Sequence, residues 1–282
     1  MSRAVLGIRP PMWNVDRSLV APEWRWAWDG LVGAWMFWEG GNPPRDIVNG
    51  VPSVFGSTVP TRSPTQHGMG LLTNRVNNEG AEIDPSFDII GKWPIQTSGT
   101  EGTIIALSDT STNNLQSMFG NRNSDNTGWR VGFVADNSLW LLFSGVANYS
   151  VVIPAQYAST NLPLVWGWSF RSGDIFRGFV NGERIVGDTS IAAGKVVTAV
   201  LPVGLMAAYS STALVNSMLR TTVCVLAYDR FLSDAEHAAL GRDLFGPFRM
   251  EDIAPWATVA VPGVSQAFRY PYHKSLRTTL AG

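Results

Sequence analysis

The feature that most constrains this chain is a long series of short apolar segments between residues 30 and 246, separated by glycine, asparagine, aspartate or proline. Apolar runs of four to eight residues between turn-forming residues are typical of β-strands, whereas helices need longer runs with a 3.6-residue period. We therefore expect strands at residues 31–38, 103–107, 129–134, 139–143, 164–170, 175–180, 183–186, 203–207 and 220–228.

Two short turns support this series of strands. Asn181-Gly182 and Asp136-Asn137 each separate two of the apolar segments. The central residues of a two-residue hairpin turn need positive φ angles, which glycine and asparagine adopt most readily. Both positions therefore predict antiparallel hairpins.

One segment has the pattern of a helix. Ser233 stands three residues before Glu236, an arrangement in which each side chain caps the backbone of the other residue. An apolar face that includes Leu240 follows, and Gly246 and Pro247 end the segment. The expected fold is therefore all-β with one short helix late in the chain.

Proline and aromatic residues divide the chain into three parts. Residues 1–29 and 247–282 are rich in both and have no helical period, so we expect an extended N-terminal arm and an extended C-terminal arm. Residues 30–246 carry the strands and are enough to form one large β-sandwich. The predicted class is a two-sheet antiparallel jelly-roll sandwich with extended terminal arms.

The chain has few charged residues. They make up 15% of its 282 residues, against roughly 25% in average soluble domains. This deficit indicates surface that is buried against partners. The net charge of −1 provides no basic field for nucleic acid or anionic lipid. The apolar runs are far shorter than the ~20 residues that cross a bilayer, so we expect neither nucleic acid nor a membrane as a partner.

The single cysteine, Cys224, lies in an apolar run, and we expect it to be a small buried hydrophobe. With one cysteine no disulfide can form within the chain, so folding does not depend on an oxidising compartment. The first residues also have no long apolar run of a secretory signal. We therefore expect the protein to be made and folded in a cytoplasm.

Several stretches follow one another in a characteristic order: an aromatic strand, an Asp-Ile-Val-Asn-Gly turn, a strand pair, and a closing strand with a short helix. They are residues 30–40, 46–50, 164–170, 177–185 and 225–236. This order resembles the laminin-G-like jelly-roll family of the concanavalin A-like lectin/glucanase superfamily, although Asn181 stands where the family usually has aspartate. The resemblance implies two packed antiparallel sheets. It does not fix a function, because the family includes sugar binders, adhesion modules and many virion proteins.

Catalytic patterns are incomplete in this sequence. Glu82 and Asp84 begin the Glu-x-Asp-x-x-Glu pattern of the superfamily's hydrolases, but the third carboxylate is absent, and glycoside hydrolysis needs a pair of positioned carboxylates. His67, His237 and His273 are isolated from carboxylate or cysteine residues at metal-ligand spacing. We therefore expect a protein that is not an enzyme, without a cofactor or a firm metal site.

One loop is rich in oxygen ligands. Asn121, Asn123 and Asp125 could help to hold Ca²⁺, a hard cation that prefers such groups. The alternative is a plain polar turn, since one carboxylate rarely suffices for calcium.

Aromatic residues gather at the start of the sandwich. Trp24, Trp26 and Trp28 alternate, so in an extended chain they would share one face. They would then fill the core, form an apolar stripe for a neighbouring subunit, or provide a stacking platform for a sugar ring. Trp35 and Phe37 alternate in the next strand, where we expect them to face the core.

Two functions fit these features. The first is a structural component of a virion, such as a bacteriophage capsid decoration protein or minor capsid protein, which binds other virion proteins and its own copies through the arms. The second is a carbohydrate- or receptor-binding module of a tail fibre or surface protein, with a glycan as its ligand.

Overall fold

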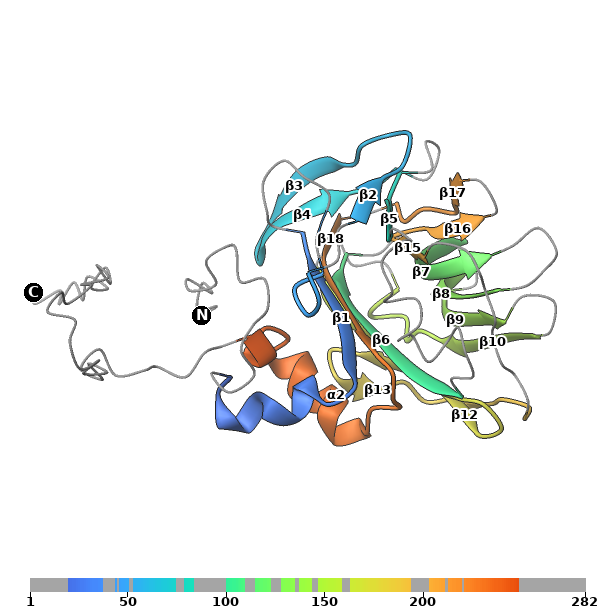
Figure 1. The fold of residues 1–282 in the computed structure, drawn as a ribbon. Helices are drawn as coiled ribbons and strands as arrows, with labels where there is room; N and C mark the ends of the chain where they lie inside the picture. The colour runs from blue at the N-terminus through green and yellow to red at the C-terminus, as the bar shows by residue number, and fades with distance from the viewer. Residues whose placement is uncertain are drawn as a thin grey trace, which may run out of the picture.

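The computed structural model describes most of the region between residues 20 and 248. The described residues are 20–37, 44, 46–50, 53–74, 79–83, 100–109, 115–122, 128–134, 137–143, 147–158, 163–193, 203–210, 213–219 and 221–248. They form two sheets that pack face to face as a jelly-roll sandwich (Figure 1). The expected all-β class with two antiparallel sheets is confirmed.

The first sheet has the strand order β13-β12-β11-β6-β18-β4-β3, with β1 paired to β18 and β14 paired to β12. All of these pairs are antiparallel. The strands are β1 (Leu31–Met36), β3 (Thr61–Thr65), β4 (Gly68–Leu72), β6 (Glu101–Ser108), β11 (Leu164–Arg171), β12 (Ile175–Val180), β13 (Glu183–Arg184), β14 (Thr189–Ser190) and β18 (Thr221–Tyr228).

The second sheet has the order β10-β9-β8-β7-β15-β5-β2, and β16 joins it through a short parallel pairing with β7. β17 pairs with β16. The strands are β2 (Ser53–Phe55), β5 (Ala81–Ile83), β7 (Gln116–Arg122), β8 (Gly128–Val134), β9 (Ser138–Phe143), β10 (Ala147–Val152), β15 (Val203–Leu205), β16 (Ala208–Ser210) and β17 (Ala213–Val215).

Aromatic rings fill the space between the two sheets. Phe133 of the second sheet packs edge-on against Trp166 and Trp168 of the first, with ring centroids 5.2 and 5.4 Å apart. Trp35 and Phe37 are fully buried in the same cluster, as their alternation predicts. Edge-to-face contacts of this kind add to the stabilisation that burial provides.

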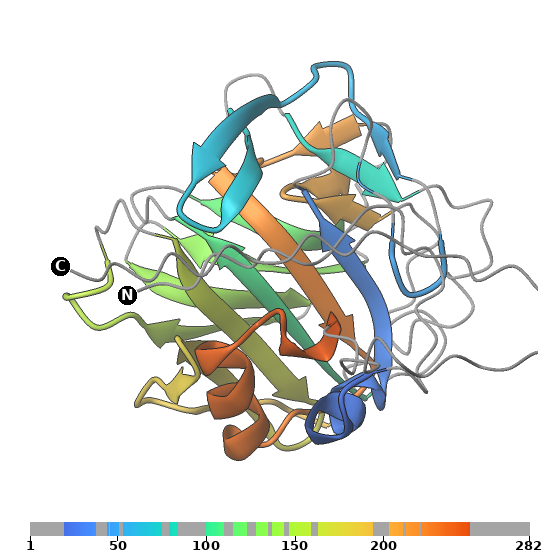
Figure 2. The ribbon, with the colours of Figure 1, turned by 90° about the vertical axis from the view of Figure 1, so that its left-hand side faces the viewer.

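A second apolar cluster lies on the other side of the first sheet, because β18 is buried on both faces. The 3₁₀ helices η2 (Pro22–Trp28) and η5 (Gly246–Phe248) and the helix α2 (Asp234–Arg242) cover it. All three lie on one side of the sandwich (Figures 1 and 2). We call this group of side chains the outer cluster; its members include Val20, Trp28, Leu31, Cys224, Leu226, Tyr228, Leu240, Phe245 and Phe248.

Cys224 and the capping box behave as the sequence predicts. Cys224 is fully buried in the outer cluster, and burial raises the pKa of its thiol to about 12. The Ser233 hydroxyl accepts a hydrogen bond from the Glu236 amide, and the Glu236 carboxylate accepts one from the Ser233 amide. None of the helices among the described residues is long and apolar enough to span a membrane.

Two expectations about the arms are wrong where the structure describes them. Residues 22–28 are not extended but form η2, with Pro22 in its first turn. Pro247 and Phe248 are not part of an extended arm but form η5, which is buried against η2. In both places burial of aromatic side chains in the outer cluster decides the conformation. Residues 1–19 and 249–282 lie outside the described residues, so the arm conformation predicted there stays a prediction.

The Asn181-Gly182 turn holds α2 against the first sheet. Both residues have positive φ angles, 51° and 81°. A Cβ atom on Gly182 would lie 2.5 Å from the carbonyl oxygen of His237, and one on Gly241 would lie 2.3 Å from the Asn181 backbone. Two glycines therefore allow the helix backbone to touch the turn directly.

Gly182→Ala is expected to destabilise the fold more than a matched change at Gly50. Gly50 has a similar φ of 73° but open space around its Cβ position. Gly50→Ala should cost only the left-handed strain of about 1–2 kcal/mol. Gly182→Ala should add about 1 kcal/mol or more, because α2 must move away. Urea unfolding measures both, and equal losses would show that the close contact is unimportant.

Candidate functional site

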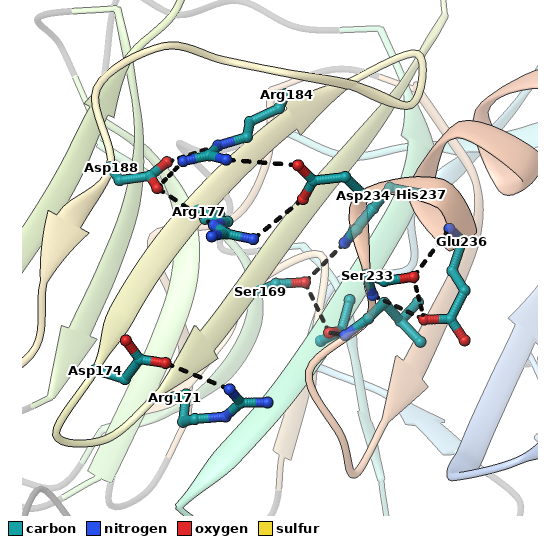
Figure 3. Close-up of polar contacts among 12 residues, drawn as sticks. Ser169, Arg171, Asp174, Arg177, Arg184, Asp188, Ser233, Asp234, Glu236 and His237 are labelled. Carbon is teal, nitrogen blue, oxygen red and sulfur yellow. Dashed lines mark hydrogen bonds and ion pairs between the residues drawn. The ribbon is translucent and has the colours of Figure 1, made fainter.

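Charged side chains form a closed ring between the hairpin β12–β13 and the first turn of α2. Arg177 reaches Asp188 at 3.3 Å and Asp234 at 3.1 Å. Arg184 also contacts both carboxylates, with its Nε 2.9 Å from Asp188 and its Nη1 3.5 Å from Asp234. Figure 3 shows the two arginines lying between the two aspartates. Since Asp234 is the first residue of α2, its charge also suits the positive end of the helix dipole.

A half-buried ring, Phe231, extends this cluster along β11. The guanidinium groups of Arg171 and Arg177 lie 4.9 and 5.3 Å from its centroid. Arg171 also pairs with Glu101 at 2.8 Å and with Asp174 at 3.3 Å. The hydrogen bond to Glu101 is the main reason that the pKa of Arg171 is raised. Each of these arginines is thus already neutralised by carboxylates.

Beneath the charged ring, a chain of buried hydrogen bonds ties α2 to the sheet. His237 Nε2 lies 2.7 Å from Ser169 Oγ, which lies 2.8 Å from Thr103 Oγ1. The Thr103 hydroxyl donates a hydrogen bond to the carbonyl of Arg230 at 2.9 Å and accepts one from the amide of Leu232. Ser169 must therefore donate to Thr103, and His237 must donate Nε2–H to Ser169. A histidine in this tautomer cannot act as a base toward the serine, so the pair is not a nucleophilic dyad.

The His237 ring is held flat against Phe179, with centroids 3.5 Å apart and the planes 7° apart. Gly167 makes room for it, since a Cβ there would lie 2.8 Å from the imidazole. Burial lowers the pKa of His237 to about 3, so the ring is neutral at physiological pH. The described polar side chains on the α2 side of the sandwich thus hold the helix against the first sheet.

The outward face of the second sheet has a different character. Strand alternation puts Trp129, Val131 and Phe133 in the core and Arg130 and Gly132 outside. We call the residues on this side of the sheet the Arg–Trp face, of which only the last two are exposed: Ser117, Arg130, Gly132, Ser138, Trp140, Asn148 and Ser150. Among the described residues, the helical elements η2, η5 and α2 all pack on the outer side of the first sheet (Figure 1).

Arg130 and Trp140 form a stacked pair on the Arg–Trp face. The guanidinium carbon lies 4.5 Å from the indole centroid, and the two residues are only 3% and 5% exposed. Gly132 is directly opposite Trp140, so no side chain competes with the indole for this position. A cation stacked on a desolvated indole is worth about 2 kcal/mol.

Hydroxyl and amide groups surround this pair. Ser117 and Ser138 are fully buried, and within the described part of the chain neither hydroxyl has a hydrogen-bond partner. On the edge strand β10, Asn148 and Ser150 are exposed, and Ser150 pairs directly with Trp140. The accessible polar groups of this face are therefore Asn148 and Ser150, and the Arg130–Trp140 stack is buried beside them.

Trp24, Trp26 and Trp28, for which the sequence left open core packing, a stripe for a subunit and a platform for a sugar ring, all contact the outer cluster. Trp28 is buried in the outer cluster, and its Nε1 donates to the carbonyl of Pro247 at 2.6 Å. Trp24 and Trp26 are half-buried against the same cluster, with their ring centroids 6.0 Å apart. Trp28 therefore packs against its own domain, which was the first of these alternatives. The 3₁₀ conformation removes the alternation on which the stripe depended.

The loop predicted to help hold Ca²⁺ is described only at its first residue. Asn121 is buried at the end of β7, and its Oδ1 accepts a hydrogen bond from the Trp129 amide at 3.3 Å. Asn123 and Asp125 lie outside the described residues, as do Asp84 and His273. Over the ranges that the structure describes, no three His, Cys, Asp or Glu side chains are grouped as metal ligands would be. A calcium role for this loop stays a prediction.

Arg130 and Trp140 were not predicted from the sequence. A usable signal was present, because Arg130 interrupts an apolar strand and Trp140 lies in the next one with the opposite parity to its core residues. What the sequence cannot supply is the register that places Trp140 beside Gly132.

Comparison with known proteins supports the fold. No protein-family model and no curated protein matches the sequence. Solved structures that match include Trypanosoma rangeli sialidase in complex with sialic acid, at 14% identity and a TM-score of 0.53 over 75% of this chain and 32% of that chain. The binding domain of Paraclostridial Mosquitocidal Protein 1 matches at 14% identity and 0.55, over 77% and 52%.

The binding domain of botulinum neurotoxin DC, in complex with rat synaptotagmin II, matches at 10% identity and a TM-score of 0.55, over 76% of this chain and 52% of that chain. The chain thus spans about a third to a half of the length of these structures. At such low identity the likeness establishes the two-sheet sandwich fold.

Acidification is expected to weaken the fold through His237. The unfolded histidine takes up a proton below its ordinary pKa of 6.5, whereas the folded one does so only near 3. The unfolded state therefore binds more protons between these values. The free energy of unfolding should fall as pH falls, by about 1.4 kcal/mol per pH unit from this group.

Urea unfolding of wild type and His237→Phe across this pH range isolates the contribution. The phenylalanine keeps an aromatic ring against Phe179 and cannot be protonated, so its pH profile should be flatter than that of wild type. Parallel profiles would contradict the role assigned to His237.

Proposed function

We propose that this chain is a non-enzymatic carbohydrate- or receptor-binding module that uses the Arg–Trp face for recognition. The observation that carries the proposal is the exposed pair Asn148 and Ser150 on β10, which lies beside the buried Arg130–Trp140 stack. Small polar side chains of this kind supply the specificity of a binding site. The buried stack joins β8 to β9 and so supports the edge strand that carries them.

The named neighbours support the same class of function. Two of the three are binding domains, one of them in complex with synaptotagmin II, and the third is a sialidase in complex with sialic acid. This support is by analogy of fold, since the same sandwich serves unrelated functions.

A binding role rather than hydrolysis follows from the residues of the face. Glycoside hydrolysis requires two carboxylates about 5–9 Å apart. The described strands β7, β8, β9 and β10 contain no aspartate or glutamate. We therefore assign no catalytic residue to the Arg–Trp face.

A glycan array and calorimetry with any sugar it identifies test the proposal. Asn148→Ala and Ser150→Ala change exposed side chains, so the fold should survive, and binding should weaken about tenfold for each, or 1.4 kcal/mol. Ser57→Ala, an exposed change between β2 and β3, is the matched control and should leave binding unchanged. Absence of any glycan or receptor ligand, or equal binding by all three variants, would contradict the proposal.

A structural role in a virion, as a bacteriophage capsid decoration or minor capsid protein, is the second proposal. It is favoured by the 15% charged fraction and by the proline- and aromatic-rich residues beyond 20–248. Co-purification with particles tests it: the full chain should be incorporated in fixed copy number, and a chain found only outside particles would contradict it.

A further inference from the structure

The second sheet ends in an edge strand that lacks the usual protection. β10 is the last strand on one side of this sheet, after β7, β8 and β9 (Figure 1). It has six residues, Ala-Asn-Tyr-Ser-Val-Val, with neither a charged residue nor a proline, and its pairing with β9 has no bulge. An exposed edge strand pairs with other chains unless charge, proline, a bulge or a short length prevents it. β10 has none of these safeguards.

The strands that end the other sides of the two sheets are protected. β3 carries Arg62 and Pro64, β13 consists only of Glu183 and Arg184, and β2 has only three residues. Helix α2 also contacts β13. The contrast singles out β10 as the sheet edge where a further strand would be accepted.

The backbone of β10 leaves three residues with hydrogen-bonding groups on the free side. Ile153, which directly follows the strand, donates its N–H to the residue before β9 at 2.8 Å, so the odd-numbered residues face β9. By alternation, the N–H and C=O groups of Asn148, Ser150 and Val152 point away from β9. Within the described chain, one bond reaches these groups, from the Thr189 hydroxyl to the Ser150 carbonyl at 2.8 Å, and that carbonyl keeps a second lone pair.

Apolar surface lies beside this free edge. Val152 is 66% exposed, and Val186, in the loop between β13 and β14, is 92% exposed, the two highest values for large apolar side chains among the described residues. The loop runs close to β10, because Val151 and Ile185 both pack 3.5 Å from the position of a Cβ atom on Gly178. A strand added at β10 would cover part of this surface, which favours association.

We infer that β10 pairs antiparallel with β10 of a second copy of this chain, across a two-fold axis at Ser150. In this register Ser150 faces the same residue of the other copy, and Asn148 faces Val152 on both sides of the axis. Every residue with free backbone groups then has a partner, so the free side of the strand is complementary to itself. This self-complementarity assigns the edge to a second copy rather than to another polypeptide.

The pairing would join the second sheets of two copies into one continuous sheet. The side chains of Asn148 and Ser150 would stay on its outer surface, with the two sets next to each other. The dimer would therefore present two recognition surfaces on one face, which raises the affinity for a ligand with repeated sites. The dimer contact itself needs neither terminal segment, and it stands whatever the Arg–Trp face binds.

Sedimentation velocity of the full chain tests the inference. The chain should form a dimer at about 0.1 mM. Ser150→Lys should weaken dimerisation about fivefold or more, because two lysines would face each other across the axis. Ser57→Lys adds the same charge at another exposed position and should leave the dimer intact. Both changed side chains are exposed, so both variants should fold.

Mixing Ser150→Lys with Ser150→Asp tests the register itself. Each variant alone should be mostly monomeric, whereas the mixture should form a heterodimer, because opposite charges then face each other across the axis. At about 1 M salt, where charges are screened within ~3 Å, the advantage of the mixture should shrink.

Three results would overturn the inference. A wild-type chain that stays monomeric at about 0.1 mM would leave the β10 edge to another polypeptide. A dimer that Ser150→Lys and Ser57→Lys weaken equally would lie elsewhere on the domain. A mixture of the Lys and Asp variants that associates no better than either variant alone would show that Ser150 does not lie on the axis.

Discussion

The structure depends on the fact that β18 is buried on both faces. One face belongs to the core between the sheets, and the other carries Cys224, Leu226 and Tyr228, which must be covered to stay out of water. Burying one such side chain is worth about 1.5–3 kcal/mol, so an open outer face would remove a large part of the net stability. The cover consists of η2, α2 and η5, from opposite ends of the folded region, and it brings those ends together.

This covering layer explains what the sequence could and could not predict about the fold. The apolar strands, the Asn181-Gly182 turn and the Ser233–Glu236 capping box are encoded by neighbouring residues, and all are confirmed. The tryptophans at positions 24, 26 and 28 also have the spacing of a strand, yet they form a 3₁₀ helix. That conformation is decided by a contact with Pro247, which no local pattern reveals. β3 has no apolar run (Thr-Arg-Ser-Pro-Thr), and it was missed because its ladder partner defines it.

The two outer faces of the sandwich follow from the same constraint. The outer face of the first sheet is covered by η2, α2 and η5. The polar residues there, which are His237 and the ring of Arg177 and Arg184, hold α2 in place. The second sheet has no described helix on its outer side, where Asn148 and Ser150 are exposed, and this is the face that we propose for recognition. The arrangement of neither set could be predicted from the sequence, because each joins side chains from several elements. Only the capping box at the start of α2 was visible in advance.

The most direct measurement of this account compares two N-terminal truncations of the chain by urea unfolding. Removing residues 1–19 leaves η2 intact, and the remaining chain should keep the stability of the full-length protein. Removing residues 1–29 takes away Trp28 and uncovers the outer cluster, so the free energy of unfolding should fall by about 3 kcal/mol or more. If both truncated chains unfold at the same urea concentration, the outer face of β18 does not need this cover, and the central claim is wrong.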